Sequence, residues 1–72
     1  MANMMVTLKF LKIKAIEDRI TQKSIAETTG LDPAYVSNVL NAKLNPGLEN
    51  LIKIAHAIGY EVEWKKIETF NK

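Results

Sequence analysis

Residues 21–43 read TQKSIAETTGLDPAYVSNVLNAK, which is two short helical patterns on either side of a glycine. Thr21 can accept a hydrogen bond from the backbone at the start of a helix, and Gly30 can end that helix in the left-handed conformation. Asp32 suits a second helix cap, with Pro33 at the first helical position after it. We therefore predict a helix of about two turns, a tight turn, and a second helix over 33–41.

The second of these predicted helices has two different sides. The side expected to be buried carries Val36, Val39 and Leu40, and Ile25 and Ala26 of the preceding helix should point inward as well. The other side is small and uncharged, with Ala34, Ser37, Asn38 and Asn41. Two short helices joined by a tight turn, about 20 residues in all, match the arrangement in which the second helix enters the major groove of DNA.

Two further helices are expected around this unit. Over about 6–18 the apolar spacing is helical, and the side chains expected to point inward are Val6, Phe10, Ile13 and Ile16, with Leu11 and Ala15 beside them. After a loop at Asn45 and Pro46, a fourth helix should bury Leu48, Leu51, Ile52, Ala55 and Ile58 and stop at Gly59. The predicted fold class is mainly α, one domain over 1–72 with its helix-turn-helix at 21–42.

The composition limits the classes of protein to consider. A chain of 72 residues, 47% hydrophobic and 25% charged, is typical of one small globular domain. No apolar run approaches the roughly 20 residues that span a bilayer, and lysines interrupt the N-terminal stretch, so we expect no membrane segment and a cytoplasmic location. The net charge of +2 decides nothing about a nucleic-acid partner by itself.

The chemistry of catalysis and of metal binding is poorly represented. The chain has no cysteine, which excludes disulfides and thiolate sites. It lacks a nucleophile-base pair, a carboxylate cluster at metal spacing and a glycine-rich phosphate loop. His56 is the only histidine, and a lone histidine favours a structural or surface role over metal binding. We therefore predict that the protein is no enzyme and uses no cofactor.

A longer stretch, residues 21–59, resembles the phage-repressor-like helix-turn-helix proteins related to the lambda repressor and Cro. The matching features are Thr21-Gln22 at the start of a helix, Ala26 where the two helices touch, Gly30 in the turn, Asn41 with Lys43, and Asn45-Pro46 before the fourth helix. With the first helix, the resemblance extends from about Leu8 to Gly59. It implies a four-to-five-helix domain that binds double-stranded DNA. Ala42 departs from the pattern, because the family usually has glycine there.

The resemblance also implies which residues touch DNA. Base contacts are expected from Pro33, Ala34, Ser37 and Asn38. Asn38 can pair with adenine, Ser37 can donate to or accept from several bases, and Ala34 and Pro33 can pack on a thymine methyl group. None of the four suits bidentate recognition of guanine, so we expect an operator half-site rich in A and T.

Contacts to the DNA backbone are expected around this face. The expected residues are Gln22, Lys23, Tyr35, Asn41, Lys43 and Asn45, with Gln22 at a helix N-terminus that favours a phosphate. Tyr35 could instead cover the junction between helices, and both roles remain open. Lys9, Lys12 and Lys14 could reach DNA, but a solvated helix face is favoured. The MANMM start could wrap DNA, although a frayed terminus is more common.

After Gly59 the pattern changes, since YEVEWKKI alternates apolar and charged residues. This period favours a C-terminal β-strand over a fifth helix, although Tyr60, Trp64 and Ile67 also fit helical spacing. A single strand needs a partner for its backbone, so we expect residues 60–68 to pair with a second copy and form a homodimer. Tyr60, Val62 and Trp64 are the expected interface residues.

Together these features predict a transcriptional regulator, a repressor by family resemblance, that binds a palindromic operator as a dimer. The alternative is the antitoxin of a toxin-antitoxin module, which would bind both DNA and a toxin protein. A third reading is a protein-interaction domain on the same scaffold.

Overall fold

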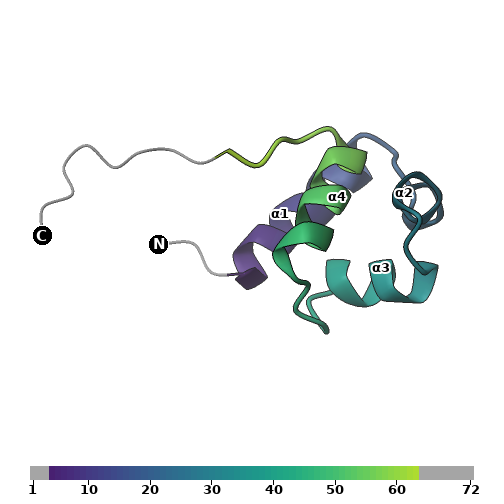
Figure 1. The fold of residues 1–72 in the computed structure, drawn as a ribbon. Coiled ribbons are helices and arrows are strands. Elements are labelled where there is room, and N and C mark those ends of the chain that lie inside the picture. The colour runs from purple at the N-terminus through teal and green to yellow at the C-terminus, as the bar shows by residue number, and fades with distance from the viewer. Residues whose placement is uncertain (1–3, 64–72) are drawn as a thin grey trace, which may run out of the picture.

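The computed structural model describes residues 4–63, apart from the side chains of residues 5 and 6. This part consists of four helices, α1 (Met4–Glu17), α2 (Gln22–Thr29), α3 (Pro33–Leu40) and α4 (Leu48–Ile58) (Figure 1). α3 packs against α1 and α2, and α4 packs against the same two helices. The predicted mainly α fold with a helix-turn-helix is therefore confirmed.

The predicted caps are present at the start and the end of α2 and at the start of α3. The Thr21 hydroxyl accepts a hydrogen bond from the Ser24 amide at 3.0 Å, and the Asp32 carboxylate accepts one from the Ala34 amide at 2.8 Å. Gly30 has a φ of 78°, the left-handed conformation that ends α2, and its amide donates to the Ala26 carbonyl. These local bonds fix the angle at which α3 leaves α2.

A single apolar core holds the four helices together. α2 and α3 contribute the residues expected of them, Ile25, Ala26, Val36, Val39 and Leu40, each at most 4% exposed. The other members of this core cluster are Leu8, Leu11 and Ala15 from α1 and Leu51, Ile54, Ala55 and Ile58 from α4. Removing such apolar surface from water is the main force that stabilises the domain.

The predicted buried side of α1 is wrong in part. Leu11 and Ala15 are buried as expected, together with Leu8, but Phe10, Ile13 and Ile16 are 47%, 51% and 66% exposed. α1 is apolar on two opposite sides, so periodicity alone could not decide which side faces α3 and α4. The predicted inward position of Val6 lies outside the described side chains.

The predicted buried stripe of α4 is shifted. Ile54 is fully buried but was not expected to be, whereas Leu48 is 52% exposed and Ile52 is only partly buried. α4 contacts both α1 and α2, and this wide contact covers the side centred on Ile54 and Ile58. Leu48 is the first residue of α4 and lies beyond the edge of the core.

The chain after α4 turns back on α1. Gly59 has a φ of 99°, the Tyr60 amide donates to the Ala55 carbonyl at 2.8 Å, and the Tyr60 ring lies against Phe10 with 5.3 Å between ring centroids. Residues 60–63 form neither a strand nor a helix. Trp64 and the rest of the predicted strand over 60–68 lie outside the described residues.

Within the described helices, none combines the length and the apolar character that crossing a membrane requires.

Candidate nucleic-acid interface

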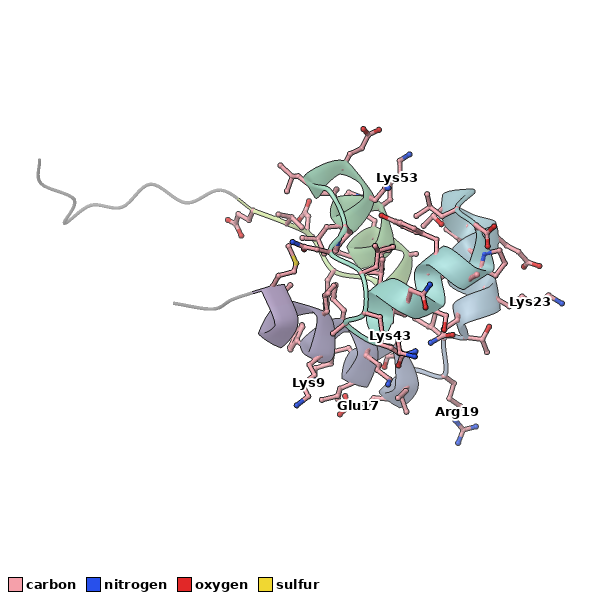
Figure 2. All side chains as sticks on the ribbon, turned by 90° about the horizontal axis from the view of Figure 1, so that it is seen from below. Lys9, Glu17, Arg19, Lys23, Lys43 and Lys53 are labelled. Carbon is pink, nitrogen blue, oxygen red and sulfur yellow. The ribbon has the colours of Figure 1, made fainter. Side chains whose placement is uncertain are left out.

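The exposed side of α3 carries the four residues expected to contact bases. Because Val36, Val39 and Leu40 face the core, Pro33, Ala34 and Asn38 are exposed and Ser37 is partly exposed. Figure 2 looks onto this side of the molecule, with α3 toward the viewer. The small side chains leave the α3 backbone close to the surface, so this side of the helix could approach the floor of a DNA groove.

Apart from Tyr35 in α3, the residues expected to contact the DNA backbone lie outside this helix, in α2 and in the segment after α3. We call the exposed side of α3 with the four expected base contacts the recognition surface. Lys23 projects from α2 and Lys43 from the loop after α3, on two sides of this surface (Figure 2). Gln22 is the first residue of α2, where backbone amides without intrahelical partners favour an anion. Asn41, Lys43 and Asn45 are exposed as well. The structure therefore brings together a central uncharged strip and a polar, basic margin.

Lys12 belongs to this margin, although the sequence favoured a solvated role for it. Its Nζ donates to Oδ1 of Asn41 at 2.6 Å, and Nδ2 of Asn41 donates to Oγ of Ser37 at 3.4 Å. The charged bond fixes the orientation of the Asn41 amide, because only its oxygen can accept from an ammonium group. Ser37 Oγ accepts from that amide, so the hydroxyl hydrogen can be donated outward. No pattern in the sequence places Lys12 beside the end of α3; only the packing of α1 on α3 does.

Tyr35 has a structural role in this surface. Its side chain is half-buried against the core, and its hydroxyl accepts a hydrogen bond from Nδ2 of Asn50 in α4 at 3.1 Å. This bond ties α3 to the first turn of α4. The hydroxyl can still donate its own hydrogen, which is compatible with a phosphate contact at the same time.

The loop after α3 begins with strained backbone. Ala42 has a φ of 59°, a conformation that costs an L-residue about 1–2 kcal/mol relative to a right-handed one. Two bonds hold it there, from the Ala42 amide to the Val39 carbonyl at 2.9 Å and from the Lys43 amide to the Asn38 carbonyl at 2.8 Å. The loop thus keeps the turn that glycine would favour, and Lys43 stays at the margin of the recognition surface.

Other charged side chains are engaged away from α3. Lys14 donates to Glu17 at 3.2 Å, and this hydrogen bond raises the pKa of Lys14. Lys53 pairs with Glu49 at 3.7 Å along α4. His56 is exposed on α4, and residues 4–63 contain no cluster of His, Asp or Glu side chains that could hold a metal ion. The described part of the chain thus offers α3 and its margin as the candidate site.

Comparison with known proteins supports the helix-turn-helix fold. A family model described as helix-turn-helix matches residues 11–65, which include the second half of α1 and all of α2, α3 and α4. No curated protein and no solved structure matches the chain.

Proposed function

The chain belongs to the helix-turn-helix family of DNA-binding regulators, and from this premise we propose that it is a transcriptional repressor that binds a palindromic operator as a dimer. The observation that carries the proposal is the exposed side of α3, where the four residues expected to contact bases are uncharged. Lys12 bonds to Asn41 at the end of this helix, and Lys23 and Lys43 project from the neighbouring elements (Figure 2). Such a surface suits a helix that enters the major groove while its surroundings hold phosphates.

The half-site should be rich in A and T. Asn38 presents an amide that can pair with N6 and N7 of adenine. Ser37 accepts from Asn41, so its hydroxyl hydrogen is directed to a base acceptor such as O4 of thymine or N7 of adenine. Pro33 and Ala34 offer apolar contact to a thymine methyl group. Each subunit then discriminates by a few kcal/mol at most, and two subunits are needed for a usable operator.

The backbone contacts should make binding strongly dependent on salt. Gln22, Lys23, Tyr35, Asn41, Lys43 and Asn45 are the proposed phosphate contacts, with Lys12 added by its position beside Asn41. For about four to six phosphate contacts per subunit, the dimer should show a slope of log affinity against log salt of roughly −7 to −11.

A selection of binding sites from random duplexes, repeated at several salt concentrations, tests both claims. We expect a two-fold symmetric consensus rich in A and T and a steep salt slope. A consensus centred on guanine would contradict the assigned base contacts. A flat slope, or protection of no duplex in footprinting, would contradict the DNA-binding surface itself.

The antitoxin alternative is supported by a different observation, the exposed apolar side of α1 with Phe10, Ile13 and Ile16. An antitoxin would use such a surface to hold a toxin protein. Purification from the native host separates the two functions, because a repressor that acts alone should elute without a second small protein.

A further inference from the structure

The outer side of α1 carries large apolar side chains that face solvent. Phe10, Ile13 and Ile16 are each about half exposed or more, and the described part of the chain does not cover them. Phe10 also lines a groove of about 330 Å³, together with Tyr60 and Val62. A contiguous patch of large, exposed apolar side chains is a candidate protein interaction site.

The order of side chains along this face is symmetric about Ile13. Phe10 and Ile16 lie three residues before and three residues after Ile13. Lys9 and Glu17 lie four residues before and four residues after it. In a helix with 3.6 residues per turn these five positions fall within about a third of the circumference. Lys9 and Glu17 project from the same side of α1 in Figure 2.

We propose that this face binds a second copy of the chain, with the two α1 helices antiparallel and crossing at Ile13. A two-fold axis through Ile13 places each Phe10 against Ile16 of the other copy and each Lys9 against Glu17 of the other copy. The charge pairs at both ends select the antiparallel orientation. Lys14 engages Oε1 of Glu17 in the same chain, and Oε2 can accept from Lys9 of the other copy.

The contact also suits the operator. In Figure 2, α3 faces the viewer while Lys9 and Glu17 point to the lower edge of the view. A two-fold axis along the line of sight therefore leaves the α3 helices of both copies on one side of the dimer, where one duplex can meet both. This inference deepens the dimer of the proposed function and moves its centre from residues 60–68 to α1. Tyr60 packs on the ring of Phe10 within the same chain and so restricts the orientation of Phe10 in the proposed contact.

Single cysteines test the register of the contact, because the chain has none of its own. In the Ile13→Cys variant the two thiols meet at the axis, and mild oxidation should give a disulfide-linked dimer. Phe10→Cys alone should not, because the two copies of residue 10 are about 9 Å apart along the helices, beyond the roughly 7 Å limit for a disulfide. Mixing Phe10→Cys with Ile16→Cys should restore cross-linking between the two variants.

Leu48→Cys is the matched control for exposure. Residue 48 is 52% exposed against 51% for Ile13, but it lies at the start of α4 and outside the proposed contact. We expect at least about tenfold less cross-linked dimer from it, since its thiols are not held within bonding distance. Equal cross-linking of Leu48→Cys and Ile13→Cys, or none from Ile13→Cys, would overturn the proposal.

Sedimentation equilibrium of the full chain supplies a second measurement. Ile13→Glu places two carboxylates at the axis and should weaken dimerisation about a hundredfold or more. Lys9→Glu alone should weaken it about three- to tenfold, and adding Glu17→Lys should restore it. An unchanged dimer in Ile13→Glu would overturn the contact and return the interface to residues 60–68. A toxin partner predicts a monomer with or without the substitution.

Binding to a single half-site separates failure of this contact from failure of the proposed function. Ile13→Glu should bind one half-site as the unchanged chain does and lose the gain from the second half-site. If neither the unchanged chain nor any variant binds a half-site, the DNA-binding proposal is refuted. The cross-linking result would still decide whether the α1 contact exists.

Discussion

Two exposed helix faces of this protein, on α3 and on α1, are built from opposite kinds of side chain. The α3 face is small and polar, and its hydrogen-bonding groups are held in place by Lys12 and Asn41. The α1 face is large and apolar, with Phe10, Ile13 and Ile16 exposed between Lys9 and Glu17. The difference indicates two kinds of partner, since groups that donate and accept hydrogen bonds suit base edges and apolar side chains suit another protein.

The largest expected effect on stability comes from a substitution in the core, and it serves as the reference for substitutions on the exposed faces of α1 and α3. Ile54→Ala removes a fully buried side chain of α4, the helix that packs against α1 and α2, and should lower the free energy of unfolding by about 2–5 kcal/mol. At a protein concentration low enough to keep the chain monomeric, Ile13→Ala, at a position 51% exposed, should change it by less than about 0.5 kcal/mol. Urea titration followed by circular dichroism measures both values. Equal losses would mean that the outer side of α1 belongs to the core.

A negative charge on the α3 face should strongly weaken DNA binding without changing dimerisation through α1. Asn38→Glu faces a carboxylate toward the DNA and should reduce affinity for the operator by at least about a hundredfold, because like charges brought together cost several kcal/mol. Residue 38 is exposed, so folding and dimerisation should not change. Fluorescence anisotropy with a labelled duplex, together with sedimentation, checks both statements. Loss of the dimer would show that the two faces are coupled.

Lys12 tests how far the α3 face depends on α1. Lys12→Met keeps the apolar stem but removes the ammonium group that holds the Asn41 amide. We expect an affinity loss of about 1–2 kcal/mol and a weaker base preference at the position read by Ser37. Lys53→Met on α4 is the control and should change neither. A uniform loss on all duplexes would instead identify Lys12 as a plain phosphate contact.

The smallest expected effect concerns the loop that carries Lys43. Ala42→Gly relieves the left-handed backbone and should stabilise the domain by about 0.5–1 kcal/mol after the entropy of glycine in the unfolded chain is included. The converse substitution, Gly30→Ala, should cost about 1 kcal/mol from backbone strain alone, since an added Cβ would meet no atom within 4 Å. Thermal unfolding compares the two. Destabilisation by Ala42→Gly would mean that the alanine side chain contributes packing that exceeds its strain.

The local features of the recognition unit could be predicted because each depends on neighbouring residues. Thr21, Gly30, Asp32 and Pro33 set the ends of α2 and α3 through bonds that span a few positions, so the exposed side of α3 followed from the sequence. Family resemblance then indicated DNA as the partner, and the matching family model supports it.

The arrangement of α1 and α4 was decided only by tertiary structure. α1 is apolar on two sides, and both satisfy helical periodicity, so the choice of Leu8, Leu11 and Ala15 for the core depends on the shape that α3 and α4 present to it. The same packing buries Ile54, places Lys12 beside Asn41, and leaves Phe10, Ile13 and Ile16 outside. The sequence by itself thus determined the ends of α2 and α3 and the exposed side of α3 that we propose to read DNA. Long-range contacts, which periodicity within one helix cannot encode, determined that the apolar side of α1 with Phe10, Ile13 and Ile16 stays outside the core.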